Sequence, residues 1–390
     1  MGCDIMTKWI ILMITLLMVT AQGEGHSYDI VFEGKDTVAI EDISLAAGTE
    51  HLFLAYTPPD STQTHILILS PELEEVKTQK VESLLSPSIG VYAQTVYLAG
   101  IQDTDIVIMR FTEDLEKIDE YSFSLEEPVD VCILPVHDGL YLSFVNRFFE
   151  EGLLRQDIFM KKLDYSFTEI SHNRITYGSF WEEPSLALFG DTVYLSYASA
   201  PLMSFLNRHI VCGALDSHLA LNNERRIPVE STADKNIFQA SLTATDNGLL
   251  LFYRISSKDF TISRFTWDGM VTIRVGNIQG ISLTPDLELG EDIIVTRDCW
   301  EQYTPSALSA FGKIYLSYTE IQSESQHLKI ISAQTPQQLK QAPPSWWETS
   351  RYWIVIPTVV VIGAAYMIYL YHKSHNSSSK KKKKQKKGNK

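Results

Sequence analysis

Cysteine is scarce in this sequence, with four among 390 residues. Cys3 precedes the first long apolar run, so Cys132, Cys212 and Cys299 remain in the body of the chain. An odd number cannot be fully paired, and Cys132 and Cys212 stand in apolar segments where a free cysteine acts as a small apolar residue. We therefore expect no framework of disulfide bonds.

Basic side chains are also few in most of the chain. Residues 24–350 carry 47 acidic and 22 basic side chains, a net charge of 22 − 47 = −25. A nucleic-acid partner requires a basic surface, so the composition predicts that nucleic acid is not a partner. An excess of acidic side chains keeps a domain soluble and attracts cations.

Motifs of well-known catalytic, metal and cofactor sites are absent. The sequence contains no HExxH, CxxC, GxSxG or Walker motif. Asp103 and Asp105 lack the rest of a calcium loop, and the ten histidines show no metal-ligand spacing. We therefore predict no cofactor and no metal. Sustained helical periodicity is missing from residues 24–336, which excludes a helical solenoid.

The first apolar run predicts export. Lys8 precedes it, and the small residues Ala21 and Gly23 follow it, as in a cleaved secretory signal peptide of residues 1–23. A retained N-terminal anchor is the alternative. Once the signal peptide is removed, residues 24–336 would form an ectodomain, followed by a linker over residues 337–351.

The second apolar run predicts a membrane anchor. Residues 352–371 carry no charge, are long enough to cross a bilayer and are bordered by aromatic residues. Residues 372–390 contain nine lysines and no acidic residue, which predicts a cytoplasmic tail that attracts anionic lipid. The alternatives are a buried core helix and a tail that only sets topology. We expect a single-pass cell-membrane protein with an extracytoplasmic N-terminal domain.

A five-residue apolar segment, mostly ending in an aromatic residue, recurs six times at intervals of 44, 44, 53, 56 and 65 residues. Such periods are typical of propellers and solenoids. Each copy follows another apolar segment and a tight turn, and two further strand-like segments come after it. We predict an all-β, six-bladed β-propeller of four-stranded antiparallel blades; a β-sandwich with accidental repeats is the alternative. The copies end at Tyr56, Gly100, Phe144, Tyr197, Tyr253 and Tyr318.

This repeat of a strand, a hairpin and an acidic turn resembles that of the sialidase-like and related six-bladed propellers. The resemblance covers most of residues 27–336 and implies the architecture. The sialidase aspartate box, roughly S-x-D-x-G-x-T-W, is matched nowhere, and residues 266–272 depart from its spacing. There is no FRIP-like segment, and the arginines are scattered, so no arginine triad is carried over. Sialidase activity does not follow from the resemblance.

The sixth copy lacks a fourth strand, whereas a surplus apolar segment, residues 28–32, precedes the first copy. An open strand edge invites aggregation, so a ring needs every edge covered. We predict that residues 28–32 pair beside residues 328–332 and close the ring.

Glutamates stand beside aromatic rings in segments that lead into the first strand of a blade, which should surround the mouth of the channel. Rings can pack on sugar faces, and carboxylates can accept hydroxyl hydrogen bonds or hydrolyse a glycosidic bond. The alternative is that the tryptophans pack between blades and the glutamates are solvated. The candidate catalytic residues are Glu182, Glu183 and Glu301, and the candidate binding residues are Glu126, Glu127, Trp181, Trp300 and Tyr303.

Two segments between the second and third strands, residues 146–155 and 200–207, are unusually apolar for loops. We predict an apolar patch that includes Phe148, Phe149, Leu202 and Phe205. It would dock a protein, a lipid surface or an apolar ligand; mutual burial of the two loops is the alternative.

The sequence thus predicts a membrane-anchored extracytoplasmic propeller that binds a protein or glycan at the cell surface. A glycosidase-type hydrolase and a scaffold subunit of a membrane complex remain alternatives. Two carboxylates that face one open pocket would favour the hydrolase.

Overall fold

The computed structural model describes residues 27–33, 43–58, 61–177, 180–200, 209–227, 235–266, 269–296, 301–322 and 325–339. The chain divides into two compact units, residues 1–341 and 342–390. The predicted signal peptide, membrane span and basic tail lie outside the described residues. Within the described ranges, no helix combines the length and apolar character that a membrane crossing requires.

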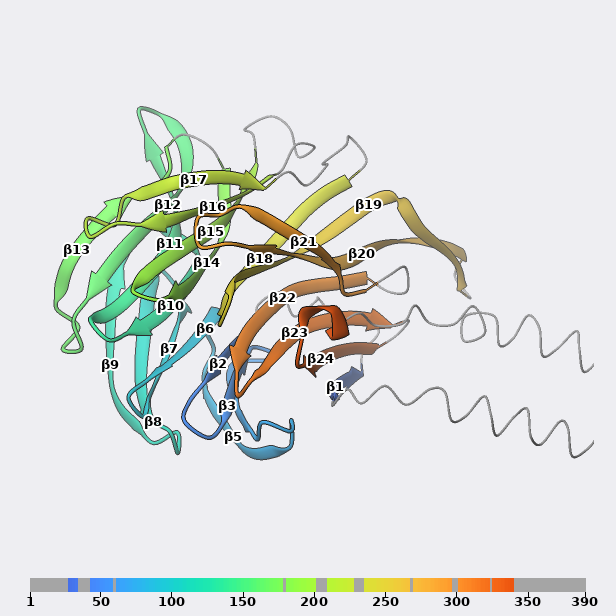
Figure 1. Cartoon of the computed structure of the whole chain (residues 1–390), viewed down its shortest axis with the longest axis horizontal. Coiled ribbons are helices and arrows are strands. Elements are labelled where there is room, and N and C mark those ends of the chain that lie inside the picture. Colours follow the sequence, from blue (N-terminus) through green and yellow to red (C-terminus); the bar gives the residue numbers. More distant parts are fainter. Residues whose placement is uncertain are drawn as a thin grey trace, which may run out of the picture. The chain divides into compact units, whose positions relative to one another are not determined.

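Six four-stranded antiparallel blades form the propeller (Figure 1). Four blades are separate sheets, whereas blades 3 and 4 are joined into one eight-stranded sheet by a parallel pairing of Gln156 with Phe180. Blade 1 is β2 (Ile43–Ala47), β3 (Leu52–Tyr56), β4 (Gln63–Leu69) and β5 (Glu75–Glu82), and blade 2 is β6 (Leu85–Tyr92), β7 (Thr95–Gln102), β8 (Asp105–Thr112) and β9 (Lys117–Ser124). Blade 3 is β10 (Glu127–Val136), β11 (Gly139–Glu150), β12 (Leu153–Leu163) and β13 (Glu169–Arg174), and blade 4 is β14 (Phe180–Phe189), β15 (Thr192–Ala200), β16 (His209–Leu215) and β17 (Leu221–Ile227). Blade 5 is β18 (Lys235–Thr245), β19 (Gly248–Thr266), β20 (Gly269–Leu283) and β21 (Leu289–Ile294), and blade 6 is β22 (Glu301–Ala310), β23 (Lys313–Gln322), β24 (Ser325–Ala333) and β1 (Ser27–Glu33), after which η1 spans Pro336–Leu339.

The repeated segment of the sequence is the second strand of each blade, namely β3, β7, β11, β15, β19 and β23. These strands are apolar on both faces because each blade is covered by a neighbour on both sides. In β3, for example, every residue is buried. The predicted six-bladed, all-β propeller is therefore confirmed.

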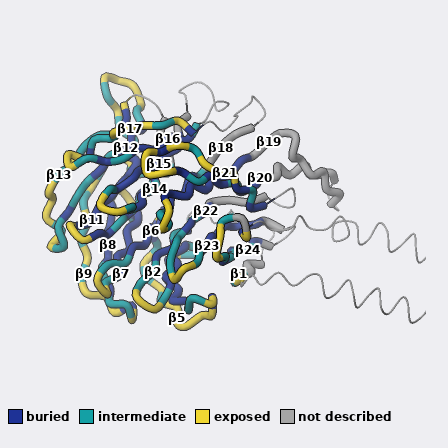
Figure 2. The backbone as a smooth tube through the Cα atoms, in the orientation of Figure 1, coloured by how far each residue is buried: buried dark blue, intermediate teal, exposed yellow. Residues whose placement is uncertain are grey.

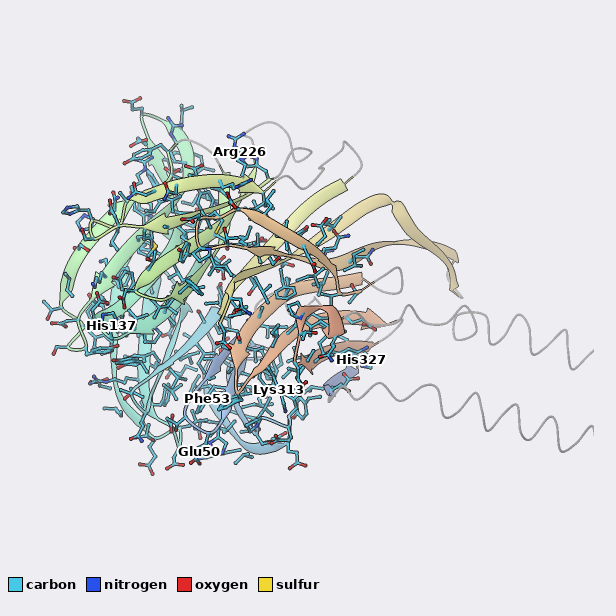
Figure 3. The ribbon with its side chains drawn as sticks, viewed as in Figure 1. Glu50, Phe53, His137, Arg226, Lys313 and His327 are labelled. Carbon is cyan, nitrogen blue, oxygen red and sulfur yellow. The ribbon has the colours of Figure 1, made fainter. Side chains whose placement is uncertain are left out.

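The ring closes through β1, as the missing strand of the sixth copy predicted. β1 pairs antiparallel with β24 in continuous register, from Ser27 opposite Ile331 to Glu33 opposite Ser325. His327 Nδ1 lies 3.0 Å from Asp29 Oδ2 at this joint (Figure 3). The first described strand thus completes the last blade and covers the edge that β24 would otherwise expose.

The hydrophobic core consists of six clusters, one at each junction between neighbouring blades. The residues of the inner strands are therefore mostly buried, whereas those of the outermost strands and the turns are mostly exposed (Figure 2). Cys212 lies in the cluster between blades 4 and 5, and it and Cys132 are free thiols. The expectation of small apolar cysteines holds for these two, and Cys299 lies outside the described residues.

The turn between the third and fourth strands is the same in five blades. A Ser, Thr or Asp side chain caps it: Asp216 Oδ1 accepts hydrogen bonds from the backbone N–H groups of His218 (2.8 Å) and Ala220 (2.9 Å). Three residues after the cap comes an apolar residue with positive φ, which for Leu219 is 59°. This side chain packs between blades, in the series Leu73, Leu115, Phe167, Leu219 and Leu287.

The strand order gives the propeller two distinct ends. We call the end where the first strands begin the upper end and the end where they finish the lower end. Ser27 pairs near the finish of β24, and Leu339 packs with Leu250 and Ile314, which lie near the starts of β19 and β23. The chain therefore enters and leaves the described propeller at its lower end.

Candidate functional site

A belt of six small polar side chains encircles the central channel. One residue from the first strand of each blade accepts a hydrogen bond from the backbone N–H of the next blade. Ser44, for example, accepts from Ile89 at 3.0 Å, and Ser306 closes the circle by accepting from Leu45 at 3.1 Å. The belt consists of Ser44, Ser88, Cys132, Ser185, Ser241 and Ser306.

Cys132 is the one belt member that is not a serine. The backbone of Leu186 hydrogen-bonds to its sulfur, as the next blade does at the other five positions. Burial raises the pKa of the Cys132 thiol to about 11, so the group is protonated at neutral pH. A neutral thiol in this setting is a structural acceptor and not a nucleophile.

Above the belt, the first strands are distorted by β-bulges. Register shifts occur between Leu85 and Ser88, Pro128 and Asp130, Glu182 and Ser185, Phe238 and Ala240, and Tyr303 and Ser306. Ser86, Glu183 and Gln239 have φ values of 50°, 59° and 52°, which side chains other than glycine rarely adopt. Such strain is costly and gathers where a structure must aim particular side chains.

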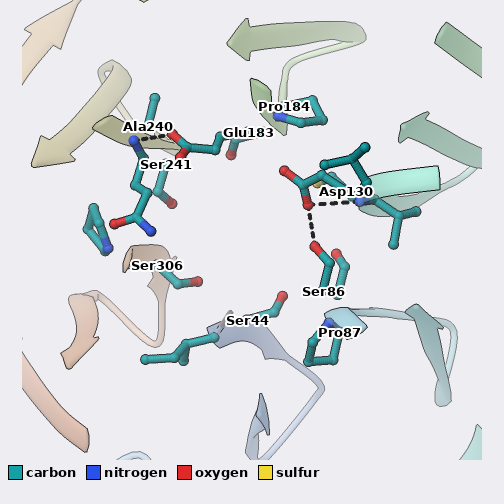
Figure 4. Close-up of a pocket in the computed structure, with 17 residues that line it drawn as sticks. Ser44, Ser86, Pro87, Asp130, Glu183, Pro184, Ala240, Ser241 and Ser306 are labelled. Atoms are coloured by element: carbon teal, nitrogen blue, oxygen red, sulfur yellow. Dashed lines mark hydrogen bonds between the residues drawn. The ribbon is translucent and has the colours of Figure 1, made fainter. Parts of the chain in front are cut away.

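The bulges aim polar side chains into a cavity of about 280 Å³ at the upper end of the channel, which we call the upper mouth. Asp130 of blade 3 and Glu183 of blade 4 point toward the same opening (Figure 4). Asp130 accepts hydrogen bonds from the Ser86 hydroxyl and from the Val131 N–H, and Glu183 accepts one from the Gln239 N–H. The described lining residues include no lysine, arginine or histidine.

A second cavity, of about 320 Å³, occupies the lower end of the same channel, and we call it the lower mouth. The six belt residues line both cavities. Below the belt, the wall consists mainly of small and aliphatic side chains such as Ala47, Val91, Leu134 and Leu188. No charged residue belongs to the described lining of the lower mouth.

Residues 146–155 of blade 3 form a hairpin, whereas the sequence suggested a loop. β11 and β12 continue to a two-residue turn at Glu151 and Gly152, and Phe149 lies opposite Leu154 in their register. The hairpin extends beyond the first and fourth strands of its own blade, because β10 pairs only as far as Arg147 and β13 only as far as Phe159. The start of β14 meets its base, where Phe180 pairs in parallel with Gln156. Its tip is exposed: Phe149 retains 71% of its accessible surface, Leu153 57% and Leu154 38% (Figure 2).

Arg174 braces this hairpin. Its guanidinium donates to Glu150 at 2.9 and 3.2 Å and, through Nε, to the fully buried Asp157 at 2.9 Å. It also lies over the rings of Phe148 and Tyr177, with 5.0 and 4.7 Å to the ring centroids. Its hydrogen bonds hold the pKa of Glu150 below the ordinary value, so that carboxylate is charged at neutral pH.

The predicted site residues fall into three groups. Glu183 lines the upper mouth, whereas Glu126 and Glu127 are outside its lining; Glu127 pairs with Arg147 instead. Phe148 is half-buried against Phe159, and Phe149 is exposed. The third group lies outside the described residues. The structure does not describe Trp300, Leu202 and Phe205, and it describes only the backbone of Trp181, Glu182, Glu301 and Tyr303.

Asp130, Ser86, Gln239 and the belt residues were not among the site residues predicted from the sequence. A signal for them was present, because the belt residue stands twelve positions before the end of the repeated segment in all six copies, as Ser44 does before Tyr56. The residue two positions earlier is Ser86, Asp130, Glu183 or Gln239 in copies two to five. Aligning the copies on their aromatic ends would have placed both carboxylates at the upper mouth.

No protein-family model and no curated protein sequence matches the chain. Among solved structures, it is similar to Trypanosoma rangeli sialidase in complex with the inhibitor DANA, with a TM-score of 0.55 and 10% identity over 80% of this chain and 60% of that one. The complex of the same sialidase with sialic acid gives a TM-score of 0.53 and 8% identity over 82% and 60%. A mutant of that sialidase displaying trans-sialidase activity gives 0.51 and 10% over 80% and 60%.

The six-bladed arrangement is thus that of the sialidase-like propellers. At such low identity the likeness concerns the fold alone. The chain also spans only about 60% of the length of these sialidases.

Proposed function

We propose that this chain is a membrane-anchored, extracytoplasmic propeller that binds a neutral glycan at its upper mouth. The observation that carries the proposal is the convergence of Asp130 and Glu183 on one cavity whose other polar groups are hydroxyls, an amide and a thiol. Carboxylates and hydroxyls accept and donate hydrogen bonds to sugar hydroxyls, which suits a polyhydroxylated ligand.

The charge of the upper mouth argues against an acidic sugar. A carboxylate-bearing ligand would meet Asp130 and Glu183 without a cationic side chain from the described lining to offset the repulsion. The sialidase fold is therefore a scaffold here, and the ligand class follows from the site. A neutral sugar or an amino sugar fits this charge.

The positions of Ser27 and Leu339, where the described propeller begins and finishes, support a tethered module. The described chain enters and leaves at the lower end, so a tether that begins after Leu339 starts on the side opposite the upper mouth. The apolar run of residues 352–371 and the lysine-rich residues 372–390 are the grounds for placing the anchor and the cytoplasmic tail there. Anionic lipid is the proposed partner of the tail.

A glycan array probed with the full-length chain in detergent tests the binding proposal. Asp130→Asn and Glu183→Gln keep an acceptor oxygen for the backbone N–H groups and remove the charges. We expect each variant to bind about fivefold to tenfold more weakly, because a hydrogen bond to a charged group contributes about 1.5–3 kcal/mol and a neutral one about 0.5–1.5 kcal/mol. Glu126→Gln, which removes a carboxylate outside the lining, is the matched control and should bind like the wild type. Equal binding by all variants would contradict the site.

Glycoside hydrolysis is a second candidate function, favoured by one observation: the two carboxylates come from adjacent blades and share a cavity. One could protonate the leaving oxygen while the other acts as base or nucleophile. Aryl glycosides of neutral sugars should then be cleaved by the wild type and by Glu126→Gln, but not by Asp130→Asn or Glu183→Gln. Binding without cleavage would leave the module non-catalytic.

A further inference from the structure

The exposed tip of the blade 3 hairpin has an apolar face that turns toward blade 4. Val145 of β11 and Ile158 of β12 belong to the hydrophobic cluster between blades 3 and 4. Side chains alternate along a strand, so Phe149 and Leu154 lie on the same face as these two. They are also opposite each other in the register and are exposed. This Phe149–Leu154 face continues the blade junction upward beyond its buried part.

The hairpin stands at a fixed position relative to the upper mouth. Arg147, on the same face, donates from Nε to Gln156 Oε1 at 3.1 Å and pairs with Glu127 at the start of β10. β10 carries Asp130 three residues later, opposite Val145. The contacts of Arg174 with Glu150 hold the other face. The apolar tip is therefore braced against the strand that supplies one of the two carboxylates.

The register gives the distance between the two features. Phe149 lies four residues along β11 from Val145, the partner of Asp130, which at about 3.4 Å per residue is a rise of about 14 Å. That is longer than a single sugar ring. Arg147 lies between the two along the same face, and its side chain, which is 32% exposed, offers a polar group on the way.

We propose that the ligand of the upper mouth is an oligosaccharide, whose chain runs from Asp130 and Glu183 along the hairpin and rests a further ring on the Phe149–Leu154 face. This inference rests on the proposed function and deepens it. An aromatic side chain has an apolar face that matches the C–H face of a pyranose, and a braced platform loses little conformational freedom on binding. The hairpin then selects for ligand length, while the mouth selects for charge.

The test is a chain-length series measured by calorimetry on the full-length protein in detergent. The probes are the chitin, cellulose and maltose series from one ring to four. In the series that binds, we expect affinity to rise by about threefold to tenfold from one ring to three, as stacking on one aromatic residue allows. Phe149→Ala with Leu154→Ala should remove this rise and leave the affinity for the single sugar within about twofold. Ile170→Ala, at an exposed apolar residue on β13 of the same blade, is the control.

Each outcome separates the two claims. If one ring binds and longer chains bind no better, the platform is wrong and the mouth stands. If a rise with length survives in the double variant, the platform lies elsewhere. If no sugar of any length binds, the proposed function itself fails. A marked fall in thermal stability of the double variant, absent from Ile170→Ala, would assign Phe149 and Leu154 to internal packing and overturn the inference.

Discussion

The two ends of the channel are built from the same six strands, share the same belt and enclose cavities of similar size, yet they differ in chemistry. The upper mouth contains two carboxylates and bulged backbone, and a braced hairpin stands beside it. The described lining of the lower mouth is uncharged, and the described part of the propeller begins and finishes at this end. The belt and the bulges recur from blade to blade and therefore belong to the fold. The two carboxylates and the long hairpin belong to single blades and are specific to the site.

Arg174→Ala should have the largest effect, because it removes the ion pairs that hold the blade 3 hairpin at the upper end. Asp157 is fully buried beside Arg174, and a buried carboxylate that loses its cation costs about 3–5 kcal/mol. We expect the free energy of unfolding in urea to fall by that amount. Arg110→Ala is the matched control: Arg110 also lies over an aromatic ring and pairs with a carboxylate, but Asp119 is 41% exposed, so the loss should be about 1 kcal/mol. Equal losses of unfolding free energy in the two variants would show that Arg174 stabilises the protein no more than a surface ion pair does.

Substitutions in the belt, which both ends share, should lower stability by an amount that depends on whether a hydrogen-bond acceptor remains. Ser241→Ala leaves the Ala307 N–H without its 2.9 Å acceptor and should cost about 1–3 kcal/mol of unfolding free energy. Cys132→Ser keeps an acceptor of the kind that the other blades use, so its effect should stay below about 1 kcal/mol. Chemical unfolding of both variants measures the difference. A larger loss for Cys132→Ser than for Ser241→Ala would contradict the view that the six positions are equivalent.

Acidification should weaken the contacts between Arg174 and the blade 3 hairpin, with the smallest effect of the three. Hydrogen bonding to Arg174 lowers the pKa of Glu150 from the ordinary 4.5. A carboxyl with a depressed folded-state pKa contributes stability that is complete above about 4.5 and is lost as the pH falls through the lower folded value. The stability difference between wild type and Glu150→Gln should therefore be present at pH 7 and shrink below pH 4.5. A difference that does not change with pH would show that Glu150 is not held as a charged partner.

The same contrast explains what the sequence could and could not predict. Second strands buried on both faces leave a repeat that can be read directly, and the missing fourth strand of the sixth copy predicted the pairing of β1 with β24. The inward-facing carboxylates cannot be read from the alternation within a strand, although an alignment of the six copies places them at the upper mouth. A bulge adds one residue and turns the following side chains to the other face, so neighbours such as Glu182 and Glu183 cannot be told apart by alternation.

The hairpin of blade 3 shows a second limit. Its residues do not alternate between polar and apolar as in a half-buried strand, because each face carries both kinds. Phe148 and Glu150 lie on one face, and Arg147 and Phe149 lie on the other. Local pattern alone therefore suggested a loop. The contact between Arg174 and Asp157, which are 17 residues apart, is tertiary and has no signature in the local sequence.

Calorimetric titration with the best-bound neutral oligosaccharide tests the contrast between the two mouths most directly. The full-length wild type, the double variant Asp130→Asn with Glu183→Gln, and the double variant Ala47→Gln with Ser309→Gln at the lower mouth would be compared. We predict at least about a tenfold loss of affinity for the upper-mouth variant and a change within about twofold for the lower-mouth variant. Equal loss in both, or loss confined to the lower-mouth variant, would contradict the assignment of the binding site to Asp130 and Glu183.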